Sequence, residues 1–149
     1  MSLALQHSPA DILQQVLIDE GFGTSPSAGA TWPIFATNEP SSPDDAITVF
    51  DTAGTDSGRS MIDGELFGRD GFQVRVRSRE HKAGYQKASD IQQHLAEGLY
   101  QETKTIESKT YLIHACVRLG GVLPIGKDVP TAKRSVFTIN GQAVISRTS

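Results

Sequence analysis

The sequence lacks the features that mark secreted, membrane-spanning or disulfide-stabilised proteins. Its one cysteine, Cys116, cannot form an internal disulfide, and it lies in an apolar stretch where we expect a buried small hydrophobic residue. The longest apolar runs are far shorter than the ~20 residues needed to span a bilayer. Residues 1–7 have neither a basic start nor a long apolar run, so no secretory signal is expected. We therefore expect folding inside a cell, without a membrane partner.

The composition is that of an ordinary globular protein. The chain has 149 residues, of which 38% are hydrophobic and 21% are charged, and a length of this order fits one domain. No internal repeat with a period of roughly 20–50 residues is visible. We therefore expect a single domain over residues 1–149.

Charge is unevenly distributed along the chain. The net charge is only −3, so no general attraction to nucleic acid is expected. Residues 39–70, however, contain eight acidic and two basic residues, whereas residues 104–149 contain seven basic and two acidic residues. Opposite patches of this kind can fix the register of identical copies that meet head to tail. They can also be two solvated faces, which is the interpretation that charge alone favours.

Two amphipathic helices are predicted. The first begins after Ser8, a good capping residue, has Pro9 in its first turn and ends at Gly21. Its apolar stripe has helical spacing and consists of Ile12, Leu13, Val16 and Leu17. The second helix is predicted over residues 83–101, with an apolar face formed by Ala88, Ile91, Leu95 and Leu99.

Strand patterns occupy most of the remaining chain. They cover residues 32–37, 46–52, 72–79, 110–119, 134–139 and 142–146. Asn140-Gly141 predicts a hairpin between the last two strands, and residues 123–126 are predicted to form a turn. Residues 53–71 are rich in glycine and acidic residues, which predicts a long, flexible and functional loop. Together these elements predict an α+β fold, with a mainly antiparallel sheet packed against two amphipathic helices.

Asp51-Thr52-Ala53-Gly54 is similar to the Asp-Thr-Gly motif of aspartic proteases. That chemistry requires two carboxylates sharing one proton. Here Ala53 separates the threonine from the glycine, which breaks the tight turn that aims the carboxylate. An Asp-Thr pair at the end of a strand is also an ordinary turn start, and we favour that interpretation.

Residues 121–128 nearly match a phosphate-binding P-loop. Asp128 occupies the position of the magnesium-binding Ser or Thr, and Pro124 and Pro130 prevent the loop from leading into a helix. We therefore interpret the segment as a turn between strands.

The four histidines are not arranged as metal ligands. Only His114 and Cys116 share a strand face, and the sequence supplies no further ligands for them. No nucleophile-elbow pattern is present, although a spatial triad stays open. We expect no catalytic, cofactor-binding or metal-binding residues.

Arg75, Arg77 and Arg79 alternate along the clearest strand, opposite its apolar face. Three like charges at this spacing repel one another. They form either a solvated face or a basic row that meets an acidic surface or lines a channel for DNA. An acidic segment of a neighbouring copy, within residues 39–70, would compensate the repulsion. The candidate interface residues are therefore Arg75, Arg77 and Arg79, with Asp56, Arg59, Asp63 and Glu65 on the other side.

Several short motifs, in this order, resemble a known family. They are residues 46–54 (AITVFDTAG), the Gly-rich segment, residues 72–77 (FQVRVR), Tyr85 with the following helix, residues 126–128 (GKD), residues 134–140 (RSVFTIN) and residues 143–145 (AVI). This order resembles the tail terminator or minor capsid proteins of long non-contractile-tailed bacteriophages, from about Ala46 to the C-terminus. The family usually has two adjacent glycines after Asp-Thr, and Ala53 replaces the first of them here.

The resemblance implies a structural virion protein without catalytic activity or cofactor. Copies would form a ring, expected to be a hexamer, at the head-proximal end of the tail, after assembly in the cytoplasm of the host bacterium. The ring would stop tube growth, contact the tail tube protein and a head completion or connector protein, and let DNA pass without sequence recognition. Residues 53–71 would order only on docking to the tube. The alternatives are a head–tail connector or stopper on the portal, or a hydrolase with a spatial triad or an Asp pair.

Overall fold

The computed structural model describes residues 3–59, 66–127 and 134–148, and has an α+β fold. In chain order the elements are α1 (Pro9–Asp19), β1 (Ile34–Ala36), β2 (Ala46–Arg59), β3 (Leu66–Ser78), α2 (His81–Gln93), a π-helical turn (His94–Gly98), β4 (Tyr100–Ile106), β5 (Lys109–Arg118), β6 (Leu123–Lys127) and β7 (Ser135–Arg147). The strands form one curled sheet in the order β1-β2-β3-β7-β5-β4, with β6 also paired to β7. Among the strands that the structure describes, β1 and β2 pair in parallel and the other pairs are antiparallel, so the predicted fold class is confirmed.

Helix α1 begins as its sequence predicts. The Ser8 hydroxyl accepts a hydrogen bond from the Asp11 amide at 3.3 Å, which satisfies one of the free donors of the first turn. A second free donor, the Ala10 amide, is satisfied from β2 by the Asp51 carboxylate at 2.9 Å. After the last turn, Gly21 has φ +83°, a left-handed conformation that glycine adopts without strain.

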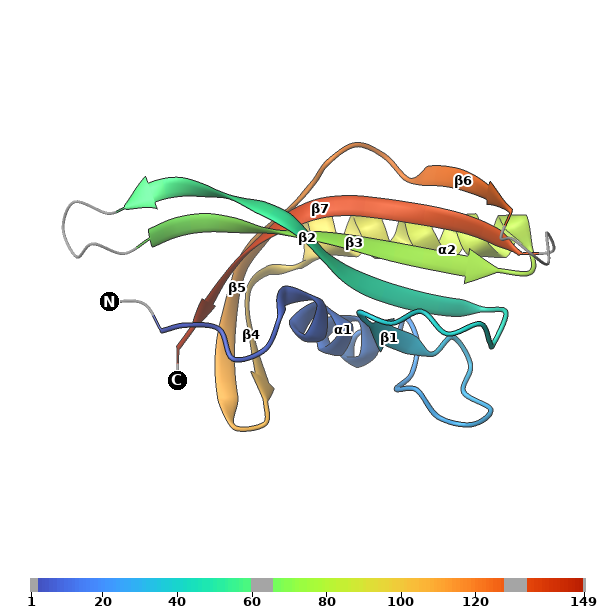
Figure 1. The fold of residues 1–149 in the computed structure, drawn as a ribbon, viewed down its shortest axis with the longest axis horizontal. Coiled ribbons are helices and arrows are strands. Elements are labelled where there is room, and N and C mark those ends of the chain that lie inside the picture. The colour runs from blue at the N-terminus through green and yellow to red at the C-terminus, as the bar shows by residue number, and fades with distance from the viewer. Residues whose placement is uncertain (1–2, 60–65, 128–133, 149) are drawn as a thin grey trace.

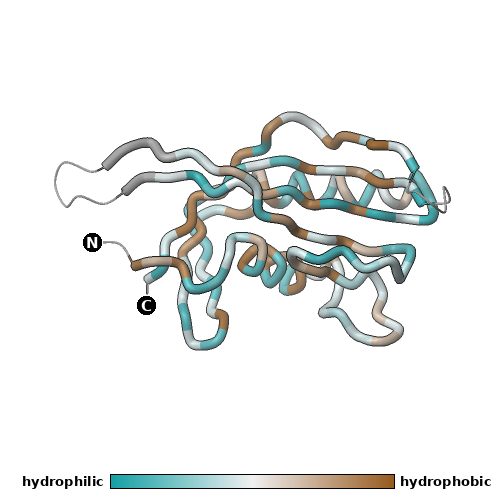
Figure 2. The backbone as a smooth tube through the Cα atoms, in the orientation of Figure 1, coloured by the Kyte–Doolittle hydropathy of each residue, from teal (hydrophilic) through white to brown (hydrophobic). Residues whose placement is uncertain are grey.

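Both helices contribute to one hydrophobic core on the same face of the sheet. The strand register brings Ile47, Val76 and Phe137 side by side across β2, β3 and β7, and all three are fully buried with the apolar stripes of the helices. Figure 2 shows hydrophobic residues recurring along these strands and in α1. We call this side of the sheet the inner face.

Strand β7 is continuous, so the predicted hairpin at Asn140-Gly141 is wrong. One edge of β7 pairs with β3, and its other edge pairs first with β6 and then with β5. Gly141 is required by packing, because a Cβ atom there would collide with the Phe72 ring and the Val117 carbonyl. A glycine inside a strand often marks a position where another group approaches the backbone closely.

The predicted long loop over residues 53–71 is largely a β-hairpin. Strand β2 continues to Arg59 and β3 starts at Leu66, so both extend past the body of the molecule (Figure 1). A register shift between Thr52 and Thr55 interrupts the pairing, and a Cβ on Gly54 would meet the carbonyl of Arg69. We call residues 53–59 and 66–70 the β-arm. Residues 60–65 lie outside the part that the structure describes, so the predicted flexibility stays a prediction.

Two further predictions fail near the middle of the chain. The second helix ends at Gln93 and continues only as the π-helical turn, and β4 follows where the helix was expected to finish. Residues 123–127 form the edge strand β6 where a turn was predicted. Among the described helices, none has the length and apolarity required to cross a membrane.

Candidate functional site

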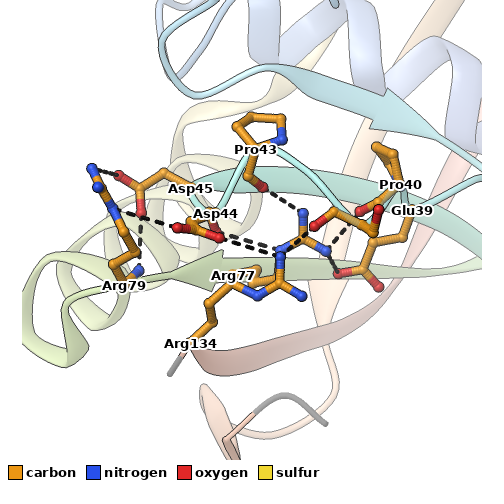
Figure 3. Close-up of polar contacts among 9 residues, drawn as sticks. Glu39, Pro40, Pro43, Asp44, Asp45, Arg77, Arg79 and Arg134 are labelled. Atoms are coloured by element: carbon orange, nitrogen blue, oxygen red, sulfur yellow. Dashed lines mark hydrogen bonds and ion pairs between the residues drawn. The ribbon is translucent and has the colours of Figure 1, made fainter. Parts of the chain in front are cut away.

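The opposite, outer face of the sheet carries the predicted arginine row, and the crossover from β1 to β2 covers one end of it. Arg77 lies beneath this crossover, residues 37–45, and only 3% of its surface is exposed. Its guanidinium donates to the carbonyl oxygens of Pro40, at 2.8 Å, and Pro43, at 2.5 Å (Figure 3). A longer contact of 3.4 Å reaches the carboxylate of Glu39. A planar guanidinium suits this role because its donors are fixed in a fork.

Two neighbouring arginines hold the same crossover. Arg134, at the start of β7, is 5% exposed and donates to the carbonyl oxygen of Ser41. It also lies 3.5 Å from a carboxylate oxygen of Asp44. Arg75 forms an ion pair with Glu39, with 3.1 Å between Nε and Oε2, so Glu39 is shared by Arg75 and Arg77. The crossover is therefore fixed to the sheet by buried, charged hydrogen bonds.

Arg79 is the accessible member of the row. Its side chain is 71% exposed and lies 3.9 Å from the carboxylates of both Asp44 and Asp45. At this exposure and distance the pairs contribute little to stability. The side chain borders a surface hollow of about 480 Å³ that Trp32 also lines. The Arg79 side chain is thus accessible to solvent, whereas Arg77 is already engaged within the chain.

The acidic residues that compensate the positive charge of the arginine row belong to the same chain and lie within residues 39–45. The other predicted interface residues lie elsewhere. Asp56 and Arg59 belong to β2 of the β-arm, and Asp63 and Glu65 lie outside the described residues. Ala46 pairs with Arg77, and Asp56 follows ten residues later along β2, a distance of about 30 Å. Along β2, the backbone position of Asp56 is therefore remote from that of Arg77.

The outer face also bears an apolar strip that sequence reasoning missed. Val117 pairs with Gln142, the Leu119 amide bonds to the carbonyl of Asn140, and Leu123 pairs with Thr138. These three apolar side chains therefore share one side of the sheet and are all exposed: Val117, Leu119 and Leu123. In the sequence, the alternation of apolar and polar residues at the end of β5 could have indicated this strip.

The protease-like and P-loop-like motifs have structural roles. Asp51 accepts the hydrogen bond from Ala10 described above, and residues 123–127 of the P-loop-like segment form β6. The rest of that segment, from residue 128, is not described.

His114 and Ser146 are the described pair closest to hydrolytic chemistry. The His114 Nε2 and Ser146 Oγ atoms lie 3.0 Å apart, on β5 and β7. No described carboxylate is hydrogen-bonded to His114, so the third member of a triad is missing from the part of the chain that the structure covers.

Within the same residues no group of three His, Cys, Asp or Glu side chains could hold a metal ion. Cys116 is buried, and burial raises the pKa of its thiol to about 12.

Comparison with known proteins identifies the family. A comparison with curated proteins gave no match. The family model described as bacteriophage tail terminator protein matches residues 16–128, which is well over half of the chain and includes α2, the arginine row and β6. The chain therefore belongs to the bacteriophage tail terminator protein family and is a structural protein of the phage tail.

Proposed function

We propose that identical copies of this protein close into a ring, expected to be a hexamer, on the finished tail tube. The ring stops the addition of tube subunits and presents a surface to a head completion or connector protein. It acts without a cofactor or catalytic step. Family membership is the observation that carries this proposal.

Two unlike surfaces on one chain support the ring. A cyclic ring of more than two copies needs a heterologous interface, in which one patch binds a different patch on the next copy. The chain offers the β-arm on one side and the outer face with Arg79 on the other. In the interface we propose, Arg79, Asp56, Arg59, Asp63 and Glu65 contact the neighbour. Arg75 and Arg77 contribute by holding the crossover, residues 37–45, in place.

DNA passes through the lumen in this proposal without being read. The net charge is −3, and no described helix presents a cluster of basic residues that could enter a groove. Contacts with DNA would therefore be independent of base sequence.

Elongation of preformed tubes tests the proposal. Tubes made from the tail tube protein are mixed with the terminator, more tube subunits are added, and tube lengths are measured by electron microscopy. We expect elongation to stop at a stoichiometry of one ring per tube. Unchanged elongation with saturating terminator would contradict the proposal.

A charge reversal tests the proposed interface. Arg79→Glu is expected to lower the fraction of multimers in light scattering and to restore tube elongation. Lys82→Glu is the matched control, because Lys82 is an exposed cation on α2 and lies outside the proposed contact. Equal behaviour of the two variants would remove Arg79 from the interface.

The first alternative function is that of a connector or stopper on the portal side of the head. It differs from a terminator in its partner, so binding to isolated portal rings, with no effect on tube elongation, would favour it.

The second alternative function is that of a hydrolase. Asp51→Asn distinguishes the two: an enzyme that uses Asp51 loses activity, whereas a ring protein changes only in stability.

A further inference from the structure

A small cavity, which we call the socket, lies between the start of α2 and the edge strand β6. It has a volume of about 230 Å³ and is lined by His81 of α2 and by Pro124, Gly126 and Lys127 of β6. The buried ring of Phe137 also lines it and meets the His81 ring edge-on, with 5.1 Å between the ring centroids. The surface inside the socket is almost entirely apolar. A cavity of roughly 150 Å³ can hold a benzene ring, so the socket has room for one aromatic side chain.

Tyr100 is an exposed aromatic residue at the other end of the same helical segment. From His81 to Gly98, α2 and the π-helical turn span roughly 27 Å, and β4 begins at Tyr100, away from the start of α2 (Figure 1). Tyr100 is 71% exposed, more than any other large apolar residue that the structure describes. Its backbone position is therefore remote from the socket of its own copy, and its ring is accessible to another molecule.

The surroundings of Tyr100 are acidic, whereas the socket carries a cation. Residues 88–102, all within the described part of the chain, contain three acidic residues and no basic one. Two of them, Asp90 and Glu97, are exposed and line a surface hollow of about 480 Å³. Lys127 in the socket is exposed, and no carboxylate of the described residues lines that cavity. Complementary charge of this kind selects a partner and fixes the orientation of docking.

The position of these acidic residues is unfavourable for a helix without a partner. Carboxylates near the C-terminus of a helix oppose its dipole, and basic residues are favoured there. Asp90 lies in the last turn of α2 and Glu97 in the π-helical turn that follows, and the last turn of α2 contains no basic residue. A cation supplied by a neighbouring molecule would compensate this unfavourable placement.

We propose that the Tyr100 ring of one copy enters the socket of the neighbouring copy, where Glu97 pairs with Lys127 of that neighbour. A second copy is the occupant because the aromatic side chain and the socket lie at opposite ends of one helical segment, in surroundings of opposite charge. A heterologous ring interface requires two such unlike patches on one chain, and aromatic residues in pockets are typical anchors of protein interfaces.

The contact is compatible with the interface proposed above for Arg79. Arg79 lies two residues before His81 in the chain, at the same end of α2 as the socket. The inference rests on the proposed ring and specifies which surfaces join its subunits.

Crosslinking between two singly substituted proteins tests the contact. Glu97→Cys and Lys127→Cys are mixed on preformed tubes and treated with a short bismaleimide, and we expect a covalent dimer with one copy of each. Cys116 is buried and does not compete. In the control mixture Arg118→Cys replaces Lys127→Cys, because Arg118 is an exposed basic residue that does not line the socket. We expect about tenfold less dimer in the control.

An exchange of the two charges tests the pairing of Glu97 with Lys127. Glu97→Lys and Lys127→Glu are each expected to lower the fraction of multimer in light scattering by about tenfold, because each places like charges together across the contact. The variant with both substitutions restores opposite charges and is expected to assemble within about twofold of the wild type. A double variant that assembles no better than the single variants would overturn the pairing.

Removal of the aromatic ring shows whether Tyr100 binds a copy or another protein. Tyr100→Ala is expected to abolish the multimer and the arrest of tube growth while circular dichroism stays unchanged. Thr103→Ala, at an exposed position on the same strand, is the control and is expected to leave both intact.

The outcomes separate this inference from the proposed function. If rings form and stop tube growth but Glu97→Cys and Lys127→Cys do not crosslink above the control, the contact is wrong and the ring stands. If Tyr100→Ala still forms rings but no longer stops tube growth, Tyr100 binds the tube protein, which also overturns the contact. If the wild-type protein neither assembles nor affects tubes, both proposals fail.

Discussion

The guanidinium of Arg77 lies 2.8 Å from the carbonyl oxygen of Pro40, beneath the crossover that joins the parallel strands β1 and β2. This contact explains how a basic row on a strand can be stable without a partner molecule. The backbone of the crossover supplies acceptors, Glu39 supplies the charge, and the buried guanidinium fixes the path of the chain over the outer face.

Arg77→Lys should destabilise the fold, because a lysine cannot donate in several fixed directions at once. Leaving buried acceptors and a partner carboxylate incompletely paired should lower the free energy of unfolding by about 2–4 kcal/mol. Urea denaturation followed by circular dichroism measures the change. Arg79→Lys is the control, and its exposed side chain predicts a change below about 0.5 kcal/mol. Equal losses of unfolding free energy in the two variants would show that the burial of Arg77 does not cause the destabilisation.

Asp51→Ala should destabilise α1, because the Ala10 amide at the helix start would lose its acceptor. Losses for capping residues are typically about 1 kcal/mol, and urea denaturation would detect one. Asp51→Asn keeps an acceptor oxygen and should lose less than half as much. If Asp51→Asn costs as much as Asp51→Ala, the negative charge, rather than the hydrogen bond, supports the helix.

Gly141→Ala should be destabilising although one methyl group is added to a strand. Its Cβ would meet the Phe72 ring and the Val117 carbonyl, and overpacking of this kind costs about 1–3 kcal/mol. Gly121→Ala is a matched control, because no atom lies near a Cβ at that position. Thermal unfolding of both variants tests this, and an unchanged melting temperature for Gly141→Ala would contradict the packing role.

Cys116 should be unreactive and should make stability depend on alkaline pH. Burial raises the pKa of its thiol from 9.0 to about 12, so the folded state holds the proton more tightly than the unfolded chain. The resulting stabilisation is fully present below pH 9 and is lost as the pH rises from 9 towards 12. Cys116→Ala should show a shallower alkaline decline in the free energy of unfolding. A thiol reagent that modifies the native protein as fast as the unfolded chain would refute the burial.

Local patterns predicted the elements that depend on near neighbours in sequence. The cap at Ser8, the apolar stripe of α1 and the alternation from Phe72 to Arg79 each follow from one residue type at one spacing. The continuous strand β7 was missed because Asn140-Gly141 has the composition of a turn, while the need for glycine arises from the distant Phe72 ring. Strand β4 was missed because its residues are mostly exposed and carry little hydrophobic alternation.

At the candidate site, too, local patterns were predicted and contacts between distant segments were missed. Sequence alone identified the arginine row and expected acidic compensation from residues 39–70. It could not identify the crossover as the partner, since the contact between Arg77 and Pro43 joins residues 34 positions apart and depends on the parallel pairing of β1 with β2. The apolar strip was missed for a related reason, because Leu123 joins Leu119 on one surface only when both lie beside β7.

The position of the protein on assembled tubes distinguishes a terminal ring from every other mode of binding. Terminator molecules carrying a gold label are mixed with growing tubes and imaged by electron microscopy. We expect one ring-shaped cluster of label at a single end of each tube, with no growth beyond it. Label distributed along the tubes, or absent from ends that have stopped growing, would contradict it.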